Sequence, residues 1–148
     1  MLSVAACFGL TVVSAVVPWV HAEIILLSFT TTASSPAAIA AFVIVATAGQ
    51  MTGKTFLYAA GRQGSRVNSP RIARLLERWR PRWMANPGKA DQLVLVSSAV
   101  GFPPFIMTAL VAGALEMQLA RFVVVGTIGR LLHFAGVAFL GDLVTRVL

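Results

Sequence analysis

The sequence predicts an all-α integral membrane protein, built as an inverted repeat of a re-entrant helical hairpin plus a transmembrane helix. Three observations lead to this prediction. Of the 148 residues, 57% are hydrophobic and 11% are charged, whereas soluble domains carry about 25% charged residues. Two apolar runs are long enough to cross a bilayer, and a nine-residue motif occurs in both. We therefore expect a single membrane domain over residues 1–148.

The repeated motif is Phe42–Gln50 (FVIVATAGQ), which returns at Phe122–Arg130 as FVVVGTIGR with five of nine positions identical. Each copy ends in a polar side chain, Gln50 or Arg130. Many secondary transporters consist of two such repeats, with the binding site between them near the middle of the membrane. Apolar runs rich in β-branched residues also match by chance, so the motif alone leaves duplication open.

The first half of the chain consists of a short apolar arm, a break, a second arm and a full pass. The first arm is slightly short for a comfortable span, and whether it crosses the membrane stays open. Proline ends the arm because it cannot continue a helix. The parts are an arm at 2–17, a break at Pro18, an arm at 19–29, a turn-rich segment ending at Pro36 and a pass at 37–60.

The second half repeats this order. Its arms are too short to span the membrane, which is typical of re-entrant hairpins whose non-helical tips face protein or a water-filled cavity. The parts are an arm at 92–100, a break at 101–104 with Pro103 and Pro104, an arm at 105–115 and a pass at 118–140. Repeat 1 is thus expected over about 18–60 and repeat 2 over about 92–140.

A basic loop at 61–91 joins the two repeats and holds eight of the twelve Lys and Arg residues. Short basic loops stay on the cytoplasmic side, so the two passes run in opposite directions and the repeats are inverted. The flanking apolar passes argue against a nucleic-acid partner. Residues 71–83 could form a basic amphipathic helix on anionic headgroups, or the loop could simply be solvated. The headgroup-facing candidates are Arg71, Arg74, Arg78 and Arg82.

Glu23 is the most informative single residue. A carboxylate within an apolar arm costs ~2.5–3.5 kcal/mol on insertion scales, so it normally faces a cavity or a partner, where it could carry a proton. If residues 18–23 instead lie at the membrane interface, Glu23 is simply hydrated. His21 could share a proton relay, although a lone His near an interface is more often structural.

Arg130 lies near the centre of the second pass, too deep to reach the interface easily. Its guanidinium suits a lipid phosphate, and an ion pair with Glu23 is an equal alternative. His133 lies three residues further on the same helical face and is expected in the same cavity. Gln50 and Lys54 are placed there too, although Lys54 could equally extend to the cytoplasmic surface.

A longer pattern resembles the signature of the DedA family, also called VTT-domain or SNARE-associated Golgi proteins. The pattern is Gly49-x-x-x-Gly53-Lys54-x-x-x-Tyr58-x-x-Gly61-Arg62-x-Gly64. The family has an acidic residue where Lys54 stands. The second half agrees through its Pro-containing arm, Ala112-Gly113, Met117, Arg121-Phe122 and Gly129. The segment at 101–105, GFPPF, is similar to the short YqaA-like branch.

The resemblance implies two facing re-entrant hairpins and transport or scrambling of lipids, such as phospholipids or polyprenyl phosphates, with proton coupling proposed for bacterial members. Glu23 matches the acidic residue of the family's first hairpin. The arginines typical of the second hairpin are missing: Ala99 or Val100 and Phe105 or Ile106 stand in their places. Proton coupling is therefore left open for this chain.

We therefore predict a lipid transporter or scramblase in the bacterial cytoplasmic (inner) membrane, and not an enzyme. The alternatives are an assembly or structural protein without transport activity, and a small-solute or ion antiporter. Membrane lipids are the expected partners, and a second copy of the chain is a further one. No cofactor or metal is expected, because Cys7 is the single cysteine and no ligand spacing is present. Close helix packing is expected at Gly49, Gly53, Gly61, Gly113, Gly126 and Gly129.

Overall fold

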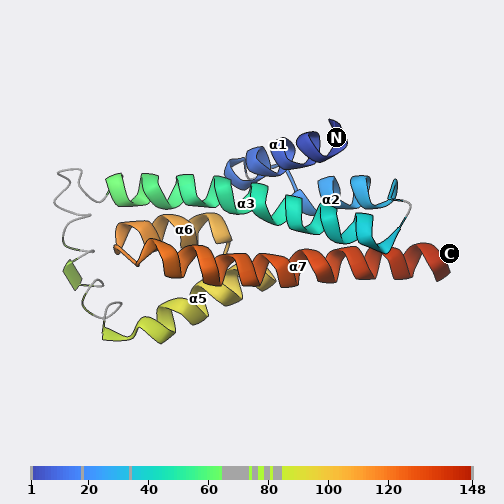
Figure 1. Ribbon diagram of the computed structural model, residues 1–148. Helices are drawn as coiled ribbons and strands as arrows, with labels where there is room; N and C mark the ends of the chain where they lie inside the picture. Colours follow the sequence, from blue (N-terminus) through green and yellow to red (C-terminus); the bar gives the residue numbers. More distant parts are fainter. Residues whose placement is uncertain are drawn as a thin grey trace. The chain divides into compact units, whose positions relative to one another are not determined.

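Six helices account for most of the residues that the structure, a computed structural model, describes (Figure 1). These residues are 2–17, 19–33, 35–64, 74, 77, 78, 81 and 85–147, without the side chains of 142–147. No strand occurs among them, so the all-α prediction is confirmed for this part of the chain. The helices are α1 (Leu2–Val16), α2 (Ala22–Thr30), α3 (Pro36–Gly64), α5 (Pro87–Val100), α6 (Phe105–Ala114) and α7 (Leu119–Val147).

The two long helices, α3 and α7, correspond to the predicted passes. Among the described residues, Pro36–Gly64 and Leu119–Gly141 are the two helical stretches long and apolar enough to cross a membrane. Both helices run further than expected. Helix α3 continues four residues past position 60, and α7 continues past the predicted end of its pass at position 140 to Val147. No proline lies between positions 141 and 147, so none of these residues removes a helical N–H donor.

Each pair of short helices is separated by a break that contains proline. Between α1 and α2 the chain leaves the helix at residues 17–21, and Pro18 itself lies outside the described residues. Between α5 and α6, Gly101 ends the helix with φ of +84°, a left-handed conformation that glycine adopts readily. A cis Phe102–Pro103 peptide bond follows, and Pro104 is the N-cap of α6.

Helix α5 begins at Pro87, five residues before the predicted start of its arm. Proline is favoured in the first helical turn, where its missing N–H would be unsatisfied in any case. Helices α1 and α2 pack against each other, as do α5 and α6. The predicted loop at 61–91 is correspondingly shorter, because α3 and α5 both extend into it.

The chain divides into two compact units that share the long helices. Unit 1 contains residues 1–53 and 130–148, and unit 2 contains residues 54–129. Unit 1 therefore holds the α1–α2 hairpin, the first part of α3 and the last part of α7. Unit 2 holds the α5–α6 hairpin with the remaining parts of both long helices. Each unit thus takes one pair of short helices and a piece of each long helix.

Unit 1 has an apolar core to which all four of its helices contribute. Leu26 of α2 and Phe134 of α7 are fully buried and form the core with Val43 and Ala46 of α3 and with Cys7 of α1. Burial of a Leu or Phe side chain stabilises a fold by about 1.5–3 kcal/mol relative to exposure to water. In a membrane the gain comes instead from close packing.

Unit 2 is held together by close contacts between α3 and α6. A Cβ atom added at Gly113 would lie closer than 3.0 Å to the backbone carbonyl of Tyr58, and one at Gly61 would meet the backbone carbonyl of Leu110 in the same way. Only glycine permits this approach of two backbones. The Tyr58 hydroxyl also donates a hydrogen bond to the backbone carbonyl of Met117.

The two glycines at matching positions of the nine-residue motif make matching contacts. In unit 1, a Cβ at Gly49 would meet the Thr11 hydroxyl and the Phe8 carbonyl of α1. In unit 2, a Cβ at Gly129 would meet the Ser98 hydroxyl and the Leu95 carbonyl of α5. Both hydroxyls donate to the carbonyl three residues earlier, at 2.9 Å from Thr11 and 3.0 Å from Ser98. The first arm of each hairpin therefore meets the following long helix through the same local arrangement.

Candidate functional site

Glu23, Arg130 and His133 come together in unit 1. Glu23 lies in the first turn of α2, and Arg130 and His133 lie one turn apart on one face of α7. The Nε2 atom of His133 is 2.9 Å from Oε1 of Glu23, and Nη1 of Arg130 is 3.9 Å from the same oxygen. One carboxylate oxygen thus faces both side chains. Glu23 and Arg130 therefore form an ion pair. From the sequence, such a pair was one of two alternatives for Arg130, and the other was binding of a lipid phosphate.

Arg130 is buried, with 8% of its surface exposed. Removing a guanidinium from water costs several kcal/mol unless an opposite charge and hydrogen bonds compensate for it. At 3.9 Å, Glu23 supplies an attraction of about 4 kcal/mol for an effective dielectric constant of about 20. The Arg130 Cζ atom also lies 5.6 Å from the ring centroid of Phe134, a cation–π geometry. Among the described residues, the Glu23 carboxylate and the Phe134 ring therefore both stabilise the cation.

Gln50, the counterpart of Arg130 in the nine-residue motif, is buried in unit 1 and contacts α1. Its Nε2 donates a 2.7 Å hydrogen bond to the hydroxyl of Ser14, which in turn donates to the carbonyl of Thr11. The Oε1 atom of Gln50 is buried without a hydrogen-bond partner among the described residues. The structure thus joins Gln50 to α1, whereas Arg130 is joined to α2.

Lys54 belongs to unit 2 and is almost fully buried, at 3% exposure. Its Nζ atom lies 5.7 Å from the ring centroid of Phe105, the first residue of α6. Lys54 and Arg130 are thus both buried cations set over an aromatic ring, one in each unit.

His21 and those prolines of the predicted hairpin breaks that the structure describes lie at or next to helix ends. His21 is exposed and is the N-cap of α2, without a side-chain capping hydrogen bond. Pro36 is the first residue of α3, and the carbonyl of Pro103 accepts a 2.6 Å hydrogen bond from the buried Ser97 hydroxyl. These prolines shape the ends of helices and carry no ionisable group.

The basic loop is described only in part. Arg74 and Arg78 are helical and exposed. Arg71 and Arg82 lie outside the described residues, so the proposed amphipathic helix at 71–83 stays a prediction.

An ion pair between Asp91 of α5 and Arg121 of α7 was missed from the sequence. It borders a cavity of about 330 Å³ in unit 2, which is also lined by Glu116 and Gln118. The sequence drew attention to Arg121 only through the family resemblance and not as a charged partner. Asp91 is the single acidic residue of α5, and that isolation was the available signal.

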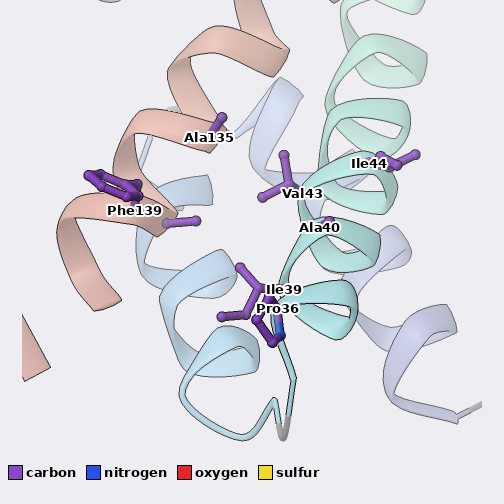
Figure 2. A pocket seen from close by; sticks show the side chains of 8 residues that line it. Pro36, Ile39, Ala40, Val43, Ile44, Ala135 and Phe139 are labelled. Atoms are coloured by element: carbon purple, nitrogen blue, oxygen red, sulfur yellow. The ribbon is translucent and has the colours of Figure 1, made fainter. Parts of the chain in front are cut away.

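A second cavity of about 450 Å³ lies in unit 1 between α3 and α7 (Figure 2). Ile39 and Val43 of α3 extend into the space between the two helices, and Ala135 and Phe139 line it from α7. All eight lining residues are apolar. This cavity contributes no polar group. The ionisable groups described together in unit 1 are therefore Glu23, Arg130 and His133.

Comparison with known protein families gives a match. The model of the VTT domain matches residues 22–143, which is most of the chain. No curated protein and no solved structure matches the chain.

Proposed function

Because the chain belongs to the VTT-domain family, whose members are membrane proteins generally proposed to be transporter-like, we propose that it moves a phosphate-bearing lipid across the bilayer. The observation that carries this proposal is the buried Arg130 beside Glu23, on a helix long enough to cross the membrane. A cation at this depth needs an anion, and a lipid phosphate is the anion that a membrane supplies. The family is not a known enzyme family.

The proposed step is an exchange of anions at Arg130. The guanidinium fork matches two phosphate oxygens better than it matches a single carboxylate oxygen at 3.9 Å. An arriving headgroup would take the place of Glu23, and Glu23 would neutralise Arg130 again when the headgroup leaves. Each half of the cycle then keeps the buried cation paired.

The contacts within each of the two units support an inverted repeat of re-entrant hairpins as the framework for this step. The first arms, α1 and α5, meet Gly49 and Gly129 at equivalent motif positions. The second arms meet the other long helix: Glu23 of α2 reaches α7, and Phe105 of α6 reaches Lys54 of α3. Two repeats related by a pseudo-twofold axis in the membrane would produce this pattern, in which each first arm contacts the long helix of its own repeat and each second arm contacts that of the other repeat. The basic loop would then face the cytoplasm and anionic headgroups.

The rival function is structural, with the Glu23–Arg130 pair serving only to fix unit 1. A third possibility is exchange of a small ion or solute at the same residues. Both differ from the proposal in one measurable respect, because neither moves a lipid headgroup.

The test is lipid translocation in liposomes that contain the purified protein and a fluorescent phospholipid, with a membrane-impermeant quencher added outside. We expect faster loss of inner-leaflet fluorescence than in protein-free vesicles. Arg130→Gln should slow this rate on the order of tenfold, the effect of losing one charge-assisted interaction. Glu23→Gln should also slow it, because Arg130 is left without its anion after each headgroup departs.

Arg121→Gln is the matched control, since it removes the same charge from an ion pair outside the proposed site. It should translocate lipid like the unmodified protein. A rate no faster than in protein-free vesicles would exclude lipid transport, and equal rates for Arg130→Gln and the unmodified protein would exclude the site.

A further inference from the structure

We infer that His133 is a positioning residue that holds Glu23 out of hydrogen-bond distance of Arg130, so that an incoming phosphate does not have to displace a hydrogen-bonded carboxylate. The inference rests on the proposed function and adds a role for a side chain that the exchange of anions leaves unassigned. Its basis is the difference between two distances that end at the same oxygen. Glu23 Oε1 is 2.9 Å from His133 and 3.9 Å from Arg130.

The shorter distance is a hydrogen bond and the longer one is not. Hydrogen bonds between nitrogen and oxygen fall at about 2.7–3.2 Å, so the Arg130 contact is an ion pair without a hydrogen bond. A carboxylate can only accept, so the Nε2 atom of His133 is the donor. The position of Glu23 is therefore set by the imidazole, and Arg130 acts on it only through charge.

Without this hydrogen bond, the carboxylate would move onto the guanidinium. A charge-assisted contact to Arg130 requires shortening of the 3.9 Å separation by about 1 Å, which a change in side-chain rotamer provides. Arg130 is buried and Glu23 is about one-third exposed, so Glu23 is the partner with room to move. A carboxylate in direct contact would compete with an incoming phosphate, and His133 prevents this closure.

The surroundings of the imidazole support a positional role. The His133 side chain is mostly buried and its ring lies 5.6 Å from that of Phe134 at an interplanar angle of 58°. Among the described residues, the charged group at hydrogen-bond distance from the imidazole is Glu23 of α2. The ring is thus mostly buried on α7 while its Nε2 lies at hydrogen-bond distance from a carboxylate of α2, which is the arrangement needed to position a side chain on a separate element.

The first test measures binding of inorganic phosphate by calorimetry in detergent, so that it needs no transport. His133→Phe keeps a ring but removes the donor, and phosphate affinity should fall on the order of tenfold because Glu23 closes on Arg130. His133→Gln is the conservative control, since its amide can donate to Glu23, and affinity should be restored. The double variant Glu23→Gln with His133→Phe should bind phosphate more tightly than His133→Phe alone.

The second test repeats these variants in the lipid translocation assay. His133→Phe should slow translocation, and it should have no further effect once Glu23 is Gln, because His133 acts through that carboxylate. Phosphate binding with the expected order of variants but no lipid movement would uphold the role of His133 and reject lipid transport. Equal losses from His133→Phe with and without Glu23, or no phosphate binding by the unmodified protein, would overturn the inference.

Discussion

Gly113 offers a sharp test of the helix packing in unit 2. Replacing it with Ala places a Cβ atom closer than 3.0 Å to the backbone carbonyl oxygen of Tyr58, 2.8 Å from the carbonyl carbon of Tyr58 and 3.0 Å from the backbone nitrogen of Arg62. All three atoms belong to the backbone of α3, so no side chain can rotate to make room. Either α3 or α6 must shift, and the second close contact between these helices, at Gly61, is disturbed with it.

The expected cost follows from this geometry. Overpacking in a well-packed core costs about 1–3 kcal/mol, and contact with backbone belongs at the upper end. Alanine recovers about 0.8–1 kcal/mol through its higher helix propensity. A net loss of about 1–2 kcal/mol should remain. For a chain of this size, about 2–4 °C of melting temperature corresponds to each kcal/mol, so Tm should fall by roughly 2–8 °C.

The assay is thermal unfolding of the detergent-solubilised protein, followed by circular dichroism. Gly136→Ala is the matched control, because it makes the same change in a helix at an exposed position with no atom within 4 Å of the new Cβ. Its Tm should stay equal or rise by a few degrees through helix propensity. If Gly113→Ala melts at or above the temperature of Gly136→Ala, the backbone contact between α3 and α6 does not exist as described.

Two further predictions concern polar contacts in unit 2. Tyr58→Phe should lower stability by about 1–3 kcal/mol in the same unfolding assay, because the buried carbonyl of Met117 loses its donor; an unchanged Tm would contradict that bond. Asp91 and Arg121 form a partly exposed ion pair, so a double-mutant cycle with Asp91→Asn and Arg121→Gln should give a coupling of at most about 1 kcal/mol. A coupling of several kcal/mol would mean that the pair is far better shielded from solvent than its exposure indicates.

The ends of the elements were predictable where a residue has a strong local effect. Pro36 begins α3, and Gly101 and the two prolines that follow end one short helix and begin the next. The extension of α7 through Gly141 was missed, because a single glycine can either end a helix or be accommodated within it. Which outcome occurs depends on packing, and here a Cβ added at Gly141 would press on the Leu27 side chain of α2.

The residues of the candidate site could be predicted from the sequence, but the contacts between them could not. Arg130 and His133 share a helical face by spacing alone, and an isolated carboxylate such as Glu23 requires a partner. The sequence could not show that His133 lies at hydrogen-bond distance while Arg130 does not, because that difference depends on how α2 packs against α7. The contact of Gln50 with Ser14 was missed for the same reason, since it joins two helices with no shared periodicity.

The division of the chain between the units has a consequence for synthesis. Unit 1 takes its residues from the beginning and the end of the chain, while unit 2 is a continuous stretch. During translation, Glu23 leaves the ribosome more than a hundred residues before Arg130 and His133. For that interval the α1–α2 hairpin carries a carboxylate without its cation, at a cost of ~2.5–3.5 kcal/mol if it enters hydrocarbon. If the hairpin is re-entrant, as proposed, it should stay near the membrane surface and enter the hydrocarbon only after α7 has been made.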